Sequence, residues 1–155
     1  MSTQNIITIS KEDPTMRDAS QLINELSDVL ETITGDGGGG SFQVKDVAHP
    51  RAMFVIARNQ AGQALGCGAI RPLDENIAEV KRMYAKSKVM GIGTQILSYL
   101  EENAKILGYS ALWLETRVVN KQAVLFYESR GYHVIPKFGI YAGRIECVCF
   151  EKRLL

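Results

Sequence analysis

The chain has 155 residues, of which 46% are hydrophobic and 23% charged, and its formal net charge at pH 7 is +1. This composition is typical of one globular domain, which we expect to cover residues 1–155, and it argues against a disordered chain. The sequence contains no Lys/Arg block and no apolar run of the roughly 20 residues that a membrane-spanning helix needs, so we expect neither a nucleic-acid nor a membrane partner.

The N-terminal segment lacks a basic start followed by a long apolar stretch, so we expect no signal peptide and a cytoplasmic protein. The three cysteines, Cys67, Cys147 and Cys149, cannot all pair within one chain, and none lies in a C-x-x-C motif. The two histidines, His49 and His133, are isolated. We therefore expect reduced, buried cysteines on strands and no metal site.

The first third of the chain predicts a strand, a helix and a glycine-rich loop. Residues 6–10 form a short β-branched run that predicts a strand. A helix follows, ended by Gly35, whose apolar side chains share one face: Leu22, Ile23, Leu26, Leu30 and Ile33. The four glycines at 37–40 predict a mobile lid beside a ligand or a passive connector. A phosphate-binding P-loop is disfavoured, because no Gly-Lys-Ser/Thr follows and no strand precedes.

The middle of the chain changes to strands from Ala52 onward. MFVIARN and ALGCGAIRPL, separated by a turn at 60–62, predict a hairpin. Residues 77–85 predict a third strand with strict alternation, which places Ile77, Glu79, Lys81 and Met83 on one face and Ala78, Val80, Arg82 and Tyr84 on the other. A helix from about Gly93 to Gly108 follows, with the apolar stripe Ile96, Leu97, Leu100, Ala104 and Leu107.

The last third predicts a buried strand at ALWLET, a helix over 121–130 closed by Gly131, a strand at YHVI and a final alternating strand over 145–152. The order is therefore β-α-βββ-α-β-α-β-β, without an internal repeat or a linker. This order indicates a single domain of the α/β (α+β) class.

The turn from Lys88 to Thr94 (KVMGIGT) carries the first chemical signal. Two glycines one residue apart let a ligand approach the backbone, and the start of the following helix attracts phosphate through its N–H groups and its dipole. Alone, this pattern is weak evidence. A dinucleotide fingerprint is disfavoured, because Ile96 occupies the position of its third glycine.

In the stretches AEVKRMYA, KVMGIGTQILSYLEENAKILGYSALWLET and NKQAVLFYESRGYHVIPKFGIY, the chain resembles the core of the GNAT superfamily of N-acetyltransferases. The resemblance runs from about Met53 to the C-terminus. GCGAIRPL, TGD after the first helix and VCFEK are similar to a branch of small stand-alone bacterial enzymes. The resemblance implies a mixed, mostly antiparallel central sheet flanked by helices, acetyl-CoA as cosubstrate and transfer of its acetyl group to a primary amine of a small molecule or peptide.

The resemblance also implies roles for individual residues. The family's turn motif aligns with Lys88 to Gly93, so backbone amides would bind the pyrophosphate; these belong to Met90, Gly91, Ile92, Gly93 and Thr94. The main chain of Met83, Tyr84 and Ala85 would pair with the pantetheine arm. Tyr127 would give a proton to the departing thiolate, and Asn120 aligns with a position that often contacts the cofactor. Arg117 stands where relatives often have a small residue, at the mouth of the substrate site.

Direct attack on a thioester needs a neutral amine, whereas a lysine-type amine has a pKa of about 10.4. A base must therefore accept a proton, directly or through water. Glu79 is the first candidate, and its alternative interpretation is a surface Glu paired with Lys81 or Arg82. Glu115 in LWLET is the second candidate.

Four further side chains have both a functional and a structural interpretation. Arg71 could bind a substrate carboxylate bidentately or be a solvated charge at a strand end. Phe138 and Tyr141 could line the acceptor pocket or simply pack. Tyr127 could equally be a helix tyrosine packed beside Phe126.

Three other activities remain open at this point: a non-catalytic module that binds CoA, an acyltransferase that uses a longer acyl-CoA, and, last, a nucleotide-binding protein. The sequence does not identify the amine acceptor. Homodimerisation, which is common among small relatives, is an expectation from the resemblance alone.

Overall fold

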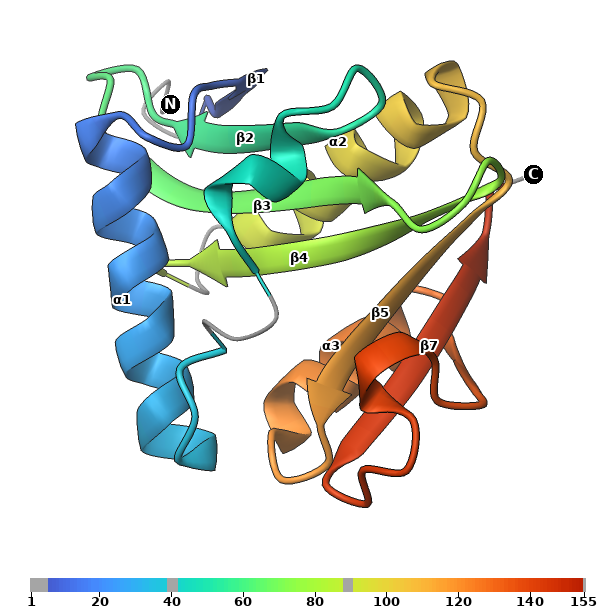
Figure 1. Cartoon of the computed structure of the whole chain (residues 1–155). Coiled ribbons are helices and arrows are strands. Elements are labelled where there is room, and N and C mark those ends of the chain that lie inside the picture. Colours follow the sequence, from blue (N-terminus) through green and yellow to red (C-terminus); the bar gives the residue numbers. More distant parts are fainter. Residues whose placement is uncertain (1–5, 39–41, 88–90, 155) are drawn as a thin grey trace.

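The computed structural model describes residues 6–38, 42–87 and 91–154, and its described strands form one seven-stranded sheet in the order β1-β2-β3-β4-β5-β7-β6 (Figure 1). The strands are β1 (Thr8–Lys11), β2 (Met53–Arg58), β3 (Ala64–Pro72), β4 (Ile77–Ala85), β5 (Ala111–Arg117), β6 (His133–Ile135) and β7 (Cys147–Arg153). The helices are α1 (Arg17–Thr34), α2 (Ile92–Ile106) and α3 (Lys121–Ser129), with 3₁₀ turns η2 (Val44–Val47) and η3 (Gly139–Tyr141).

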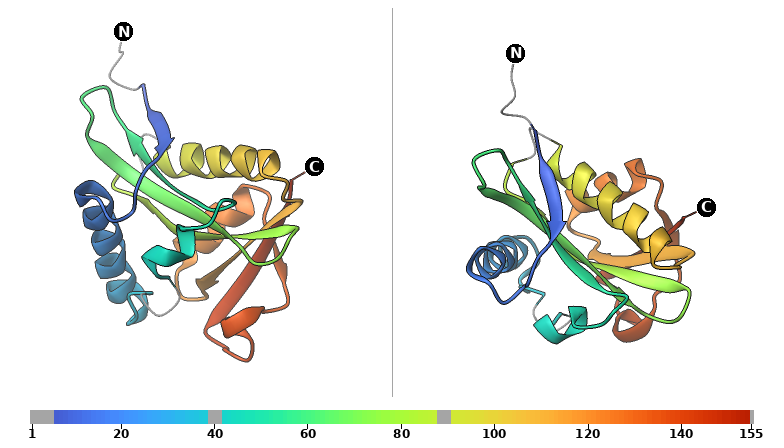
Figure 2. Two further views of the ribbon diagram at one scale, coloured as in Figure 1. Left: turned by 45° about the horizontal axis from the view of Figure 1, so that its top comes forward. Right: turned by 90° about the horizontal axis from the view of Figure 1, so that it is seen from above.

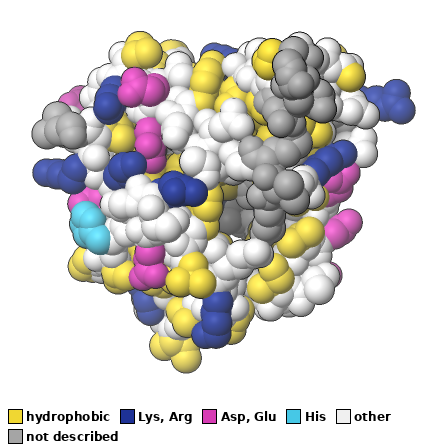
Figure 3. Space-filling view, turned by 180° about the vertical axis from the view of Figure 1, so that it is seen from behind, with side chains coloured by type: hydrophobic (Ala, Val, Ile, Leu, Met, Phe, Trp, Pro, Cys, Tyr) yellow, Lys and Arg dark blue, Asp and Glu magenta, His cyan; other side chains and the backbone are white. Residues whose placement is uncertain are grey.

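The predicted fold class and element order are confirmed. Helix α1 and η2 cover one face of the sheet, and α2 and α3 cover the other (Figure 2). On the face of α2 and α3, Lys and Arg side chains lie among Asp and Glu side chains (Figure 3). The two 3₁₀ turns were not predicted, because each spans only a single turn and has no apolar period of its own.

Strands β4 and β5 form the one parallel pair between described strands, and this pairing is short. It runs from Ile77 opposite Ala111 to Glu79 opposite Trp113, and then stops. Strand β5 continues along β7 instead, down to Arg117 opposite Cys147. The sheet therefore divides into two parts that separate beyond Glu79, as Figure 1 shows.

Helix α2 packs on the sheet through the stripe that its sequence predicts. Ile96, Leu97, Leu100 and Ala104 are buried, and Leu107 caps the helix at its C-terminal end. They belong to a core cluster that also contains residues of β2, β3, β4, β5 and β7. This layer fixes the N-terminus of α2 relative to the end of β4.

Only the first half of α1 packs on the sheet. Ala19 and Leu22 are buried against a cluster that includes Phe54 and Ile56 of β2. Further along, Ile33 is 41% exposed although it shares the apolar face of the helix. The second half of α1 therefore extends past the sheet, beside the region where β4 and β5 separate.

The strict alternation predicted for β4 is wrong after Lys81, because the strand contains a β-bulge. Cys67 lies opposite Tyr84 but Ala69 lies opposite Lys81, and Arg82 has a φ of +54°. The extra residue moves Arg82 and Tyr84 to the α1 face and Met83 to the α2 face. The bulged stretch of β4 contains no glycine, so this strand carries no local signal for the bulge.

The cysteines behave as the sequence predicts. Cys67 on β3 and Cys147 and Cys149 on β7 are buried and free. None of the described helices is both long and apolar enough to cross a membrane.

Glycines in β3 allow the close approach of α2, and Gly66 provides a test. A Cβ at Gly66 would lie 2.5 Å from the carbonyl oxygen of Tyr84 and 3.0 Å from side-chain carbons of Ile92 and Ile96. Gly66→Ala is expected to lower the free energy of unfolding by about 1–3 kcal/mol through overpacking. Denaturant unfolding measures this loss. Gly37→Ala, whose Cβ would meet Ser27 at an ordinary 3.4 Å, is the matched control, and equal stability of the two variants would contradict the packing argument.

Candidate active site

A cleft of about 320 Å³ lies where β4 and β5 separate. Its walls come from the second half of α1 and the residues after it, from β4 and β5, and from α3 and η3. Because β5 does not pair with β4 beyond Glu79, the edge of β4 from Val80 onward faces this cleft. The cleft is thus a direct result of the short parallel pairing.

The main chain of Met83, Tyr84 and Ala85 lies on this edge, as the resemblance requires. Tyr84 and Ala85 pair with Cys67 and Gly66 of β3 on their other side. Met83 lines the cleft. Within the described chain, this segment therefore has one paired and one unpaired edge, the arrangement to which an extended ligand can add.

The N-terminus of α2 begins just beyond that edge. Gly91 is its N-cap, with a φ of +66°, and a Cβ at this position would have no atom within 4 Å. The N–H groups of the first turn, which includes Ile92, Gly93 and Thr94, have no acceptor inside the helix. The helix starts at Ile92, one residue before the expected Gly93. Open space, N–H donors and the positive end of the helix dipole together suit an anion.

A basic side chain that sequence reasoning missed lies at the same place. Arg130 donates from Nε to Oγ1 of Thr94 at 3.1 Å and stacks over the ring of Phe126. Nothing local in the sequence marks it, since Arg130 follows α3 and meets α2 only in the fold. Lys88 and Met90, which were expected to complete the turn, lie outside the described residues.

Tyr127 of α3 is buried and also lines the cleft. Its ring makes edge contacts with Phe126 and Tyr132, so the packing interpretation and the functional one are compatible. Burial raises the pKa of Tyr127, which keeps its hydroxyl protonated at neutral pH. Asn120 also lines the cleft and caps α3 by accepting the N–H of Ala123 at 3.3 Å.

Glu79 is 1% exposed and lies in a network of charged and polar side chains. Its Oε1 accepts from Nε and Nη2 of Arg71 at 3.0 and 2.8 Å, and its Oε2 accepts from the hydroxyl of Tyr141 at 3.0 Å. Nζ of Lys81 donates to the same hydroxyl at 2.8 Å and lies 3.5 Å from Oε2. The interpretation of Glu79 as a surface residue is therefore wrong, whereas the pairing with Lys81 is correct.

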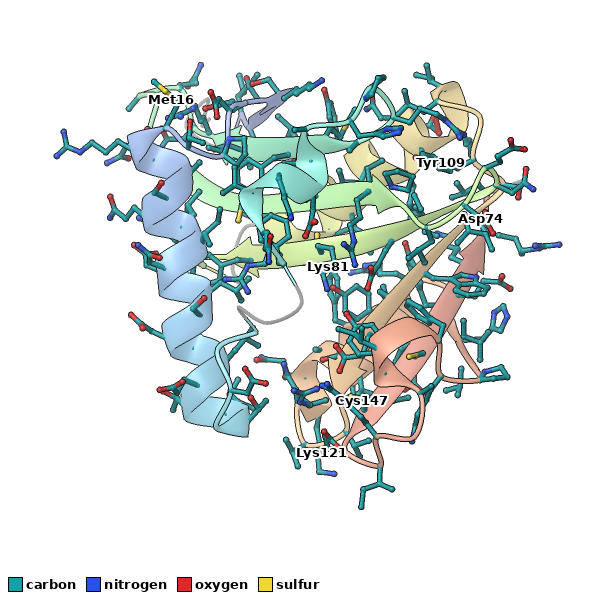
Figure 4. The ribbon with its side chains drawn as sticks, viewed as in Figure 1. Met16, Asp74, Lys81, Tyr109, Lys121 and Cys147 are labelled. Atoms are coloured by element: carbon teal, nitrogen blue, oxygen red, sulfur yellow. The ribbon has the colours of Figure 1, made fainter. Side chains whose placement is uncertain are left out.

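Lys81 and Tyr141 connect this network to the cleft, since both line it. Figure 4 shows Lys81 in the space between β4 and β5. Burial lowers the pKa of Lys81, and the charge of Glu79 opposes this shift. Arg71 is not among the described residues of the cleft wall, because its guanidinium pairs with Glu79 and, at 3.4 Å, with Asp46. Its expected contact with a substrate carboxylate is therefore not supported by its position.

An ion pair spans the mouth of the cleft. Arg117 at the end of β5 contacts Asp36, beyond the end of α1, at 2.9 Å. It also contacts Glu115 at 3.2 Å and donates to Sγ of Cys147 at 3.0 Å. Both predicted residues, Glu115 and Arg117, line the cleft, as does Asp36, which belongs to the TGD stretch of the resemblance but was not selected as a site residue.

Phe138 does not line the cleft as far as the described residues define it; it packs against Trp113 and Tyr141 at ring distances of 5.0 and 5.3 Å. Two side chains near it that sequence analysis did not select, Ile140 and Arg144, do line the cleft. The stretch from η3 to Arg144 therefore forms part of the wall, through Tyr141 as expected and through Ile140 and Arg144, which were not expected.

Arg82, another cleft residue that was not selected, joins β4 to α1. It donates to the carbonyl oxygen of Ile23 at 2.9 Å and of Gly37 at 3.2 Å, and to the hydroxyl of Ser27. Its Nε is buried without a hydrogen-bond partner in the described chain. The bulge brings Arg82 to this position, so strand periodicity alone could not predict it.

Comparisons with known proteins agree with this geometry. The model of the Acetyltransferase (GNAT) family matches residues 19–132. The IAA acetyltransferase of Azospirillum brasilense is 33% identical over 151 residues, which cover 96% of this chain and 98% of that protein. The N-acetyltransferase YsnE of Bacillus subtilis is 27% identical over 150 residues, covering 94% of this chain and 99% of that protein.

Solved structures show the same fold. An acyl-CoA N-acyltransferase of Klebsiella pneumoniae superposes with a TM-score of 0.82 at 27% identity, over 97% of this chain and 99% of that chain. An aminoglycoside 6'-N-acetyltransferase complexed with coenzyme A superposes with a TM-score of 0.63 at 20% identity, over 96% and 97% of the two chains. The chain therefore belongs to the GNAT acetyltransferase family, and it is an acyltransferase whose cosubstrate is acetyl-CoA.

Proposed function

We propose that this protein transfers an acetyl group from acetyl-CoA to a primary amine of a small molecule or peptide, in the cleft between β4 and β5. The observation that carries this proposal is the arrangement of three features: the unpaired edge of β4 that faces the cleft, the N-terminus of α2 just beyond that edge, and the network of Lys81, Tyr141 and Glu79. Bound acetyl-CoA supplies the reactive thioester. The relatives are named for different acceptors, so they support the reaction rather than one substrate.

Residues of three elements fit the cosubstrate. The first-turn N–H groups of α2 and the charge of Arg130 suit its diphosphate, and the open space at Gly91 leaves room for that anion. The main chain of Met83 to Ala85 offers a strand edge for the pantetheine arm. The backbone N–H near Tyr84 or Ala85 would donate to the thioester oxygen as negative charge develops there.

The network around Glu79 would remove the proton of the incoming ammonium group. In this relay, the hydroxyl oxygen of Tyr141 would accept a proton from the ammonium group. At the same time, Tyr141 would pass its own hydroxyl proton to Oε2 of Glu79. The 3.0 Å hydrogen bond between Tyr141 and Glu79 supports this direction of transfer. Glu115 is the second candidate base: it lines the cleft, and one of its oxygens accepts from Arg117.

Tyr127 would then donate its hydroxyl hydrogen to the departing sulfur. A thiol has a pKa of about 8.5, below that of a tyrosine, so the sulfur leaves readily and needs a hydrogen-bond donor more than a strong acid. The raised pKa of Tyr127 keeps this donor available across the neutral range.

Gly91→Val tests the diphosphate site. A valine side chain would fill the open space at the start of α2, so the affinity for acetyl-CoA is expected to fall at least roughly tenfold, as measured by calorimetry. A positive φ strains valine in any setting, and Gly62→Val controls for this: Gly62 has a φ of +81°, similar open space and a place in the β2–β3 turn. Unchanged acetyl-CoA affinity in Gly91→Val would refute the site.

Tyr127→Phe removes the proposed donor to sulfur and keeps the buried ring. We expect kcat to fall roughly ten- to a thousandfold with little change in the KM for acetyl-CoA, the pattern of a lost interaction in the transition state. Release of free CoA thiol from acetyl-CoA and a panel of amines gives both constants. A variant with wild-type kcat would show that Tyr127 only packs.

Tyr141→Phe tests the proton relay while leaving the Glu79–Arg71 pair in place. At pH 7 we expect kcat/KM for an alkylamine to fall roughly tenfold or more. The loss should shrink at higher pH or with an amine of low pKa, because such an amine is already neutral and needs no base. Glu79→Gln should show the same dependence on amine pKa. A loss that is equal for all amines would instead indicate a purely structural role.

A further inference from the structure

We propose that the amine acceptor of this enzyme carries a carboxylate, which Arg144 binds at the outer end of the cleft. The substrate class is therefore a small amino carboxylic acid rather than a polyamine or another purely cationic amine. This inference rests on the proposed function, since it concerns the acceptor of the same cleft.

The charges on the cleft wall carry the argument. Four basic side chains line it in the described chain, Lys81, Arg82, Arg117 and Arg144, against two acidic ones, Asp36 and Glu115. A site for a polycation would need the opposite balance, because like charges repel the ligand. An excess of positive charge beside an acceptor site instead favours a ligand with a negative group.

Most of these charges already have partners. Arg82 donates to carbonyl oxygens of α1 and the following residues, and Lys81 donates to Tyr141 beside Glu79. Arg117 is paired with both acidic residues of the wall, Asp36 and Glu115. Both acidic side chains of the cleft wall are therefore already paired with an arginine.

Arg144 is the exception. The guanidinium of Arg144 makes no hydrogen bond and no ion pair within 4 Å with any described residue. The pKa of Asp36 is lowered mainly by the hydrogen bond from the N–H of Gly38 and then by Arg117, and the charge of Arg144 makes the smallest contribution. Its backbone is well fixed: the N–H of Arg144 donates to Tyr141 at 3.1 Å, and its carbonyl oxygen accepts from Cys147 at 3.2 Å. A guanidinium on such a backbone offers paired N–H donors that match a carboxylate.

The order of groups along the cleft fits one small molecule with two charged ends. Tyr141 and Lys81 mark the reactive end, where the amine must lose its proton. Arg144 follows Tyr141 by three residues and lies at the mouth near Asp36. Leu26, Leu30 and Ile140 add apolar wall. An amino acid with an apolar side chain would place its amine at the reactive end, its carboxylate at Arg144 and its side chain against the apolar wall.

Product binding tests this inference without the complication that an amino acid and its amide differ in amine pKa. The CoA-saturated enzyme is titrated by calorimetry with N-acetylleucine and N-acetylleucinamide, and with the corresponding phenylalanine pair. We expect the carboxylate of at least one pair to bind about tenfold more tightly than its amide. Arg144→Gln should remove most of this preference, whereas Arg153→Gln, which replaces an exposed arginine at the end of β7, should retain it.

Equal binding of acid and amide in both pairs, no binding of either, or a preference that survives Arg144→Gln would overturn the inference. A separate activity assay distinguishes the failure of this inference from the failure of the proposed function. If the wild type releases CoA thiol with amines but shows no carboxylate preference, the substrate class is wrong and the acetyltransferase proposal stands. If it binds acetyl-CoA but releases no thiol with any amine, the proposed function itself fails.

Discussion

The early end of the parallel pairing between β4 and β5 is the constraint on which the site depends. Three residue pairs join the strands, and beyond Glu79 each strand follows a different neighbour. A fully paired sheet would satisfy the edge of β4 with β5 and leave no cleft. The unpaired polar backbone that results is costly when buried, so the fold tolerates it only where solvent or a ligand can supply hydrogen bonds.

The bulge in β4 is a second feature that shapes the cleft. By shifting the face of every residue after Lys81, it brings Arg82 to α1 and places Met83 on the opposite face. Arg82 then ties the carbonyl oxygens of Ile23 and Gly37 to the sheet. These bonds hold the second half of α1, which extends past the sheet, in place as a wall of the cleft. Few side chains of this half of the helix are buried.

Local patterns in the sequence predicted the strands and the α-helices, but neither the two 3₁₀ turns nor the site contacts. The stripe from Ile96 to Ala104 predicted α2 because helix burial repeats with the helical period. The turn at Gly91 was selected from its two glycines and the start of a helix, whereas the role of Tyr127 came from a resemblance in order and spacing. The Arg71–Glu79 pair, the Asp36–Arg117 pair and the position of Arg130 could not be found in this way, since each joins residues that only the folded sheet brings together. The bulge at Arg82 could not be predicted either, because β4 contains no glycine at that position.

On our proposal, Glu79 and the cations that line the cleft both act on the protonation of the acceptor amine. The buried carboxylate of Glu79 accepts hydrogen bonds from Arg71 and Tyr141 and lies 3.5 Å from Nζ of Lys81, so its desolvation is offset by these partners. An ammonium group entering beside Lys81 would meet positive charge from that lysine and, further out, from the arginines of the mouth. Nearby like charge lowers the pKa of an ammonium group and favours its neutral form. On our proposal, the charges that attract a carboxylate to the mouth therefore also make the amine easier to deprotonate, which reduces what the relay through Tyr141 must supply.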